Sequence, residues 1–193
     1  NQKFFSEKII FLPHQYQVQN NELQISEITP TKKDLGLPED YFIYCAINNT
    51  YKISPEIFDI WMRLLGKVER SVLWLLDNNP SSKQNLINEA KSRGIEKDRL
   101  VFSKRTTHEN YLAQLKHADV YLDTFVYNAG ATASNALFVG VPVITKIGKS
   151  YTARMASSLL RSIDLSELIT TSSEDYEKLA FELSTNPEKL KKI

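Results

Sequence analysis

The stretch VYLDTFVYNAGATASNALFVGVP, residues 120–142, decides the fold that we predict for this chain. A short apolar strand over 120–122 leads into a turn rich in Asn, Gly and Thr. The helix that follows ends at Gly140, because a glycine with a proline shortly after it, here Pro142, is a typical helix stop. The free N–H groups of the turn and the positive end of the helix dipole favour an anion there.

Length and composition are those of a globular domain with a full hydrophobic core. The chain has 193 residues, of which 42% are hydrophobic and 24% charged. Its net charge of +1 gives no reason to expect nucleic acid or a membrane surface as a partner. No apolar run approaches the roughly 20 residues that cross a bilayer. The single cysteine, Cys45, lies in an apolar run, so we expect a buried core residue in a cytoplasmic protein without a disulfide framework.

Apolar patterns predict six strands that alternate with helices. The strands are expected over 41–47, 71–76, 100–102, 120–122, 141–145 and 168–170. The first three helices are expected over 55–68, about 81–93 and about 108–118, and Ser54 caps the first of them. The fourth follows the turn around Gly130 and ends at Gly140. The fifth runs from its cap Ser150 through Ile163, and the sixth from its cap Ser172 through Leu183. This alternation predicts an α/β fold, a Rossmann-like doubly wound parallel sheet.

The chain divides into two parts. Residues 41–193 carry the regular pattern of the Rossmann-like lobe, whereas residues 1–40 form an irregular lead-in or inter-lobe segment with an apolar patch over 4–12. Because the chain begins at Asn1 rather than at Met, we expect it to be a piece of a longer protein. The packing partner of the lead-in segment is then expected upstream of this piece.

A binding site is expected where the strand order of such a sheet reverses, outside the carboxyl ends of the strands. If the order is the usual 3-2-1-4-5-6, the loops after the first and fourth strands meet there. The first loop carries Asn49 and Lys52, and the second is the turn around Gly130. Lys52 then faces the helix N-terminus across a cleft, which suits the diphosphate of a nucleotide sugar. A solvated surface lysine and an ordinary tight turn are the alternatives.

Two other kinds of site find no support in the sequence. His14, His108 and His117 are scattered and lack cysteine or carboxylate companions at ligand spacing, so we expect no metal site. No serine lies in a GxSxG elbow, which argues against a hydrolase.

Several motifs, taken in order, carry a family resemblance. They are NNTYKISPE (48–56), SVLWLL (71–76), ADVYLDT (118–124) and YNAG (127–130), together with LPH (12–14) and LIT (168–170). They closely resemble the C-terminal catalytic lobe of the O-linked N-acetylglucosamine transferase and SPINDLY family. The resemblance implies one lobe of a GT-B glycosyltransferase, usually found behind tetratricopeptide repeats. It further implies metal-independent transfer of N-acetylglucosamine from UDP-N-acetylglucosamine to a Ser or Thr of a protein, with inversion.

Position by position, the resemblance assigns the phosphate half of the donor site. Lys52 matches the lysine that stabilises the departing UDP, and Tyr51 is its neighbour in the same motif. Asn49 stands where animal members have a glutamine near the phosphates. Thr132 matches one of two threonines at the phosphate-binding turn, which also contains Gly130, whereas Ala131 replaces the first threonine and keeps only its N–H.

The nucleoside half departs further from the family pattern. Thr106 lies where the backbone reads the uracil edge, and His108 where a side chain reaches the ribose. Tyr111 stands in place of a histidine beside the base, and Gln114 in place of an arginine. Asn135 replaces the aspartate that binds the ribose hydroxyls, and its amide is a weaker, neutral acceptor.

These departures leave two alternatives open. One is a GDP-fucose-type donor, as in SPINDLY-type transfer. The other is a lobe that has lost donor binding and acts as an interaction module. If the transferase reading holds, the missing N-terminal lobe supplies the acceptor side, so this piece alone is expected to bind nucleotide without turnover.

Overall fold

Six parallel strands form one sheet in the order β3-β2-β1-β4-β5-β6 in the computed structural model, which describes residues 2–18 and 20–193. The strands are β1 Phe42–Ala46, β2 Ser71–Leu76, β3 Leu100–Ser103, β4 Val120–Leu122, β5 Val143–Lys146 and β6 Ile169–Thr170. The predicted doubly wound sheet is therefore confirmed, and its order reverses between β1 and β4, as expected.

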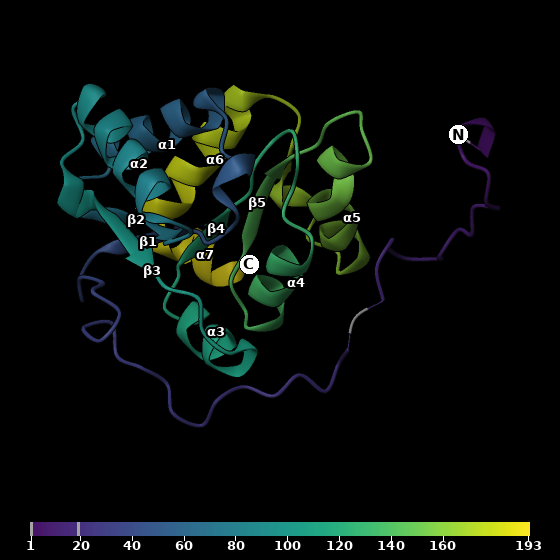
Figure 1. Ribbon diagram of the computed structural model, residues 1–193, viewed down its shortest axis with the longest axis horizontal. Helices are drawn as coiled ribbons and strands as arrows, with labels where there is room; N and C mark the ends of the chain where they lie inside the picture. The colour runs from purple at the N-terminus through teal and green to yellow at the C-terminus, as the bar shows by residue number, and fades with distance from the viewer. Residues whose placement is uncertain (1, 19) are drawn as a thin grey trace.

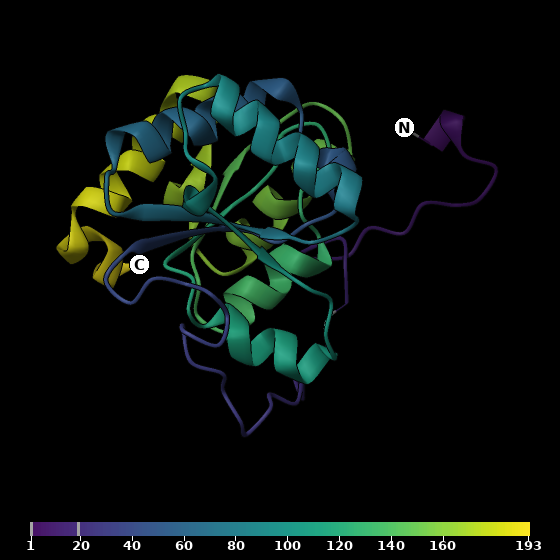
Figure 2. The same ribbon diagram turned by 60° about the vertical axis from the view of Figure 1, so that its left-hand side comes forward.

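Helices cover both faces of this sheet (Figures 1 and 2). They are α1 Pro55–Lys67, α2 Pro80–Ser92, α3 His108–Leu115, α4 Ala131–Phe138, α5 Met155–Ser162, α6 Ser173–Thr185 and α7 Pro187–Lys192. On one face lie α1, α2 and α6, and on the other lie α3, α4 and α5, since right-handed crossovers that move in opposite directions from β1 place their helices on opposite faces.

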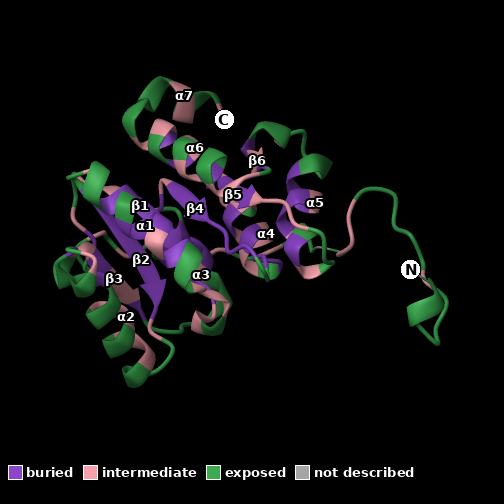
Figure 3. Ribbon diagram, turned by 90° about the horizontal axis from the view of Figure 1, so that it is seen from above, coloured by how far each residue is buried: buried purple, intermediate pink, exposed green. Residues whose placement is uncertain are grey.

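The core lies between these layers, and its strands are buried on both faces (Figure 3). Every residue of β2 is buried, and so are four of the five residues of β1. This is why both strands read as continuous apolar runs. Helix α1 buries the stripe that includes Ile57, Trp61 and Leu64, and the Ser54 hydroxyl caps it by accepting from the N–H of Ile57.

One predicted helix start is wrong. Ser150 was expected to cap the helix after β5, but α5 begins only at Met155. The Ser150 hydroxyl instead accepts from the N–H of Ala153 at 3.2 Å, within the loop that leads into the 3-10 turn Thr152–Arg154. The loop is too tight for an α-helix to start earlier, because the N–H of Gly148 donates to the Ala153 carbonyl at 2.7 Å.

The lead-in segment is irregular, as predicted, and its two ends behave differently. Its described residues form one 3-10 turn, Gln2–Phe4, and otherwise only turns and bends. The first residues extend away from the domain (Figure 1), and Phe11 is 89% exposed. Further along, the segment returns to the domain, where the Pro30 carbonyl lies 2.6 Å from His117 Nε2. The division at residue 40 stays a prediction, and its positions 1 and 19 lie outside the described residues.

A search of the described residues for a helix both long and apolar enough to cross a bilayer finds none.

A buried hydroxyl joins α6 to the end of β4. Tyr176 Oη donates to the Asp123 carbonyl at 2.9 Å and accepts from the Trp61 indole N–H at 3.4 Å. Tyr176→Phe is therefore expected to lower the free energy of unfolding by about 1–3 kcal/mol, because both groups lose a buried partner. Urea denaturation measures this loss. Tyr51→Phe, at a side chain that is 71% exposed, is the matched control, and equal midpoints for the two variants would contradict the expectation.

Candidate nucleotide-binding site

A cavity of about 310 Å³ opens at the carboxyl ends of the strands, where the strand order reverses. Its walls come from the loops after β1, β2 and β3, from α3 and from the start of α4. The lining residues are Ile47, Asn48, Asn49, Leu76, Ser103, Lys104, Arg105, Thr106, His108, Tyr111, Gln114 and Thr132. A cleft at this position is the usual ligand site of a doubly wound sheet.

Six residues singled out from the sequence line this one cavity. They are Asn49, Thr106, His108, Tyr111, Gln114 and Thr132. Asn135 lies next to them, with its Oδ1 3.3 Å from His108 Nε2. The two residues that the resemblance assigns to the ribose are thus in contact with each other. The individual roles of all these residues stay predictions.

The cavity also contains residues that the sequence did not single out. Arg105 Nη2 donates to Asn49 Oδ1 at 3.0 Å and lies 3.4 Å from Asn78 Oδ1, so a guanidinium stands at the mouth of the cavity. Arg105 lies two residues after the end of β3. The loops after the first and fourth strands were expected to bind a ligand because they follow the carboxyl ends of strands, and the same criterion applied to the third strand would have identified Arg105.

Two buried polar groups at the cavity have no partner among the described residues. These are the amide nitrogen of Asn48 and the hydroxyl of Tyr111. Burial raises the pKa of the Tyr111 hydroxyl, which keeps its proton. Because this hydroxyl is buried while the residue lines the cavity, a ligand would meet the Tyr111 ring, as expected for stacking against a base.

The N-terminus of α4 has no side-chain cap, unlike α1, α3 and α6, which are capped by Ser54, Thr107 and Ser172. The first N–H groups of a helix have no partner within the helix. Ala131, the first residue of α4, is exposed, so its alanine keeps the backbone of this turn open. The predicted anion position is therefore present as an uncapped helix end beside the cavity.

Lys52 faces the turn before α4 from the loop after β1. Its Nζ donates to the Asn128 carbonyl at 3.1 Å and lies 4.0 Å from the centre of the Tyr127 ring. The Tyr51 ring is exposed and packs at a tilt against Tyr127, with the centroids 6.3 Å apart. Burial lowers the pKa of Lys52, and the negative charge of Asp123 opposes that shift. The expected meeting of the two loops is thus observed.

A buried carboxylate holds this turn from inside. Asp123 Oδ1 accepts from the N–H groups of Ala129 at 2.6 Å and Thr124 at 2.8 Å, and Oδ2 accepts from the Thr145 hydroxyl at 2.6 Å. Burial raises the pKa of Asp123 to about 7, while these hydrogen bonds and the charge of Lys52 oppose the rise. Asp123 is one of the polar residues expected after the fourth strand, but its central position was not predicted, because an acidic residue after a strand carries no signal of its burial.

Gly130 is buried at the other edge of the turn. A Cβ added there would lie 2.6 Å from both the Tyr16 hydroxyl and Met155 Cε.

Within residues 2–18 and 20–193, no three His, Cys, Asp or Glu side chains are placed to hold a metal ion, and metal independence stays a prediction.

Fold and site together define a Rossmann-like lobe with a nucleotide-sized cavity at the switch point of its sheet. The chain belongs to glycosyl transferase family 41, whose profile matches residues 10–193. The predicted family resemblance is confirmed.

Curated relatives agree with this family. The chain is 33% identical over 195 residues to the probable UDP-N-acetylglucosamine–peptide N-acetylglucosaminyltransferase SEC of Arabidopsis thaliana, covering 98% of this chain and 20% of the relative. It is 29% identical to the UDP-N-acetylglucosamine–peptide N-acetylglucosaminyltransferase of Caenorhabditis elegans, covering 92% and 15%. A probable SPINDLY transferase of Eustoma exaltatum is 26% identical, covering 93% and 20%. The chain thus spans about a fifth or less of these relatives.

Solved structures agree as well. The O-GlcNAc transferase of Thermobaculum terrenum, in its K341M mutant, is similar with a TM-score of 0.76 and 29% identity, over 80% of this chain and 32% of that chain. The UDP-GlcNAc 2-epimerase of Neisseria meningitidis, with a TM-score of 0.57, 12% identity and coverage of 81% and 39%, shares the fold alone.

The buried Asp123 makes stability depend on pH. Its folded pKa of about 7 lies above the unfolded value of 3.8, so between these values the folded chain binds more protons than the unfolded chain. The free energy of unfolding is therefore expected to fall as pH rises from about 4 to 7 and to gain no further slope from this group above that. Asp123→Asn keeps an oxygen acceptor but cannot ionise, so it should remove this slope.

Urea denaturation of the parent and of Asp123→Asn between pH 5 and 8 measures the difference. The exposed Asp98→Asn is the matched control and should keep the slope of the parent. An Asp123→Asn profile parallel to that of the parent would show that Asp123 does not titrate in this range.

Proposed function

We propose that this chain is the donor-binding lobe of a protein O-glycosyltransferase. The reaction transfers N-acetylglucosamine from UDP-N-acetylglucosamine to a Ser or Thr hydroxyl of an acceptor protein, with inversion at the anomeric carbon. The observation that carries this proposal is the cavity beside the uncapped α4, because six residues assigned to the donor line it together. The printed names of the Arabidopsis and Caenorhabditis relatives support the same donor and the same class of acceptor.

In this proposal the nucleoside occupies the cavity between α3 and the strand ends. Tyr111 offers its ring to the base, while His108 and Asn135 bind the ribose. The diphosphate then lies at the start of α4, where the free N–H groups and the helix dipole favour it. Arg105 at the mouth of the cavity adds a second positive charge on that side.

Lys52 acts on the leaving group. The acceptor hydroxyl gives up its proton to a base outside this lobe as its oxygen attacks the anomeric carbon, the bond from that carbon to the diphosphate breaks, and the bonding electrons stay on UDP. The ammonium group of Lys52, held at the turn by the Asn128 carbonyl, offsets the charge that develops there. One preorganised donor of this kind lowers a barrier by about 2.7–4 kcal/mol.

Replacing Lys52 tests its role at the leaving group. In the full-length protein, Lys52→Met should lower kcat by about 10²–10³ with a smaller effect on KM for the donor, because the charge acts on the developing diphosphate. Transfer to a Ser-containing peptide measures both constants. The exposed Lys97→Met is the matched control and should keep the parent kcat. An unchanged kcat in Lys52→Met would contradict this role of Lys52, whereas no transfer by the parent itself would support the alternative of an interaction module, which the losses at Ala131 and Asn135 favour.

Binding of different nucleotides tests which nucleobase the cavity prefers. Calorimetric titration of the full-length protein should give heat with UDP and UDP-N-acetylglucosamine and weaker binding of GDP. The replacements at Tyr111 and Gln114, beside the base, leave GDP-fucose as the alternative donor. Tighter binding of GDP than of UDP would decide for that alternative, and no heat with any nucleotide, in a folded sample, would exclude donor binding.

The chain spans only about a fifth of its Arabidopsis relative. We propose that an N-terminal lobe, and tetratricopeptide repeats before it, belong to the same longer protein, which acts in the cytoplasm without a metal. The coverage of only 20% of the Arabidopsis relative and the free, buried Cys45 support this view. Residues 1–193 alone should then bind UDP and transfer no sugar, and transfer by this piece alone would contradict the division of labour between the lobes.

A further inference from the structure

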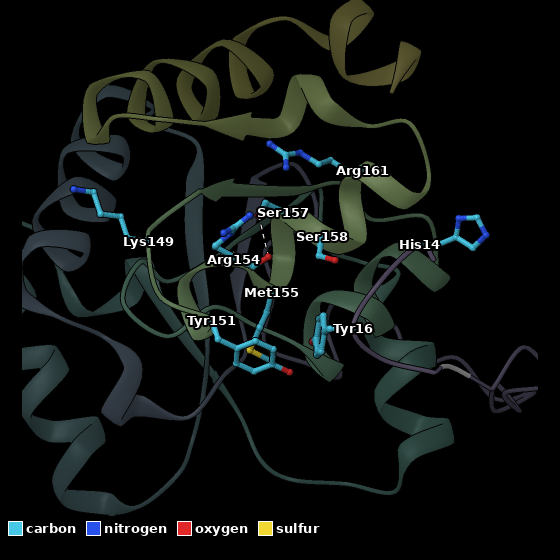
Figure 4. Close-up of a pocket in the computed structure, with 9 residues that line it drawn as sticks. All are labelled: His14, Tyr16, Lys149, Tyr151, Arg154, Met155, Ser157, Ser158 and Arg161. Carbon is cyan, nitrogen blue, oxygen red and sulfur yellow. Dashed lines mark hydrogen bonds between the residues drawn. The ribbon is translucent and has the colours of Figure 1, made fainter. Parts of the chain in front are cut away.

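A second cavity, of about 410 Å³, lies on the other side of the turn that precedes α4 (Figure 4). The lead-in segment supplies one wall, and the loop after β5 together with α5 supplies the other. The lining residues are His14, Tyr16, Lys149, Tyr151, Arg154, Met155, Ser157, Ser158 and Arg161. Tyr16 and Met155 both reach Gly130, so this cavity begins where the phosphate-binding turn ends.

The loop that forms this cavity is bonded to the turn of the donor site. The N–H of Asn128 donates to the Thr152 carbonyl at 2.9 Å, and the Thr152 hydroxyl donates to the Val126 carbonyl at 3.0 Å. The loop closes on itself at Gly148, where an added Cβ would lie 2.5 Å from Ala153 Cβ. The wall that follows β5 is therefore bonded directly to the turn that precedes α4.

The charge of this cavity is positive. Lys149, Arg154 and Arg161 line it, and no Asp or Glu does. None of these three cations forms a salt bridge in the described part of the chain. Arg154 ends the 3-10 turn just before α5 and Arg161 lies near the end of this helix, so the backbones of the two residues stand about 10 Å apart along the helix axis. His14, on the lead-in segment, lies at the edge of the cavity, and its ring points outward (Figure 4).

A buried donor without a partner lies at the inner end of the cavity. The Tyr16 hydroxyl is buried and has no hydrogen-bond partner among the described residues. Burial raises the pKa of this hydroxyl to about 12, so it keeps its proton and stays a donor. Nearby, the Tyr151 ring packs edge-on against the Tyr16 ring, with the centroids 5.6 Å apart, and gives the cavity an apolar wall.

We propose that this cavity binds the acceptor polypeptide through acidic side chains that flank the modified Ser or Thr. This inference rests on the proposed function: it adds a contact on this lobe to the acceptor side that the N-terminal lobe supplies, because the cavity begins at Gly130, where the phosphate-binding turn ends. Two carboxylates about three residues apart on an extended chain match this backbone spacing, so each could pair with one guanidinium.

Fluorescence anisotropy with the full-length protein tests this assignment. The probes are a labelled peptide that carries Glu on both sides of one Ser and a second peptide with Gln at the same positions. The Glu peptide should bind about tenfold more tightly than the Gln peptide, the scale of two partly exposed ion pairs. Arg154→Gln/Arg161→Gln should remove this preference and leave the affinity for UDP unchanged.

The matched control is Lys91→Gln/Lys97→Gln. It removes the same charge from exposed positions beside β3, at the opposite end of the sheet, and should keep the preference. Equal binding of the two peptides, or a preference that survives in Arg154→Gln/Arg161→Gln, would overturn the inference. So would displacement of the Glu peptide by an equal concentration of inorganic phosphate, or Arg154-dependent binding of phosphatidylserine vesicles in its place.

Titration of UDP into the same samples separates this inference from the proposed function. Heat with UDP but no preference for the Glu peptide would overturn the acceptor site alone. No heat with UDP, with the preference intact, would overturn the donor assignment and with it the acceptor role of the cavity.

Discussion

The site depends on one buried carboxylate. Burying an ionisable carboxyl is costly unless hydrogen bonds replace its water, and Asp123 receives three such bonds. Two of them come from backbone N–H groups at the two ends of the turn, Thr124 and Ala129, and the third comes from Thr145 on the neighbouring strand. The path of the chain into α4 is thereby fixed, and the helix N–H groups are free to face a ligand.

The strand order then brings a second loop to this turn. Because β1 and β4 are neighbours, the segment after β1 must emerge beside the segment after β4. A buried hydrogen bond from the Tyr121 hydroxyl to the Ile47 carbonyl, at 3.1 Å, holds the two ends together. Lys52 follows Ile47 by one short turn and so reaches the Asn128 carbonyl. Lys52 therefore lies close to the N-terminus of α4 because of the strand order of the sheet.

Local patterns were enough to predict the sheet, and they failed where distant segments meet. Strands such as β2 are buried on both faces, so their sequence is an apolar run that any reader of the chain can find. The predicted start of α5 at Ser150 was wrong because Gly148 packs against Ala153 in the loop before the helix. A serine that could cap a helix gives no sign of that contact. The second cavity was missed for a related reason, since its walls come from segments far apart in sequence.

The two halves of the proposed donor site differ in the kind of interaction they offer. Lys52 and the α4 dipole act on the charge of the proposed diphosphate, whereas Gln114 and Asn135 offer neutral amide groups on the nucleoside side. Neutral bonds contribute about 0.5–1.5 kcal/mol each, and bonds to charged groups about twice that. Donor affinity should therefore follow the diphosphate, while the choice of base rests on small differences among a few neutral groups. A replacement beside the base, such as Gln114, can thus alter which nucleotide is preferred without weakening the binding of the phosphates.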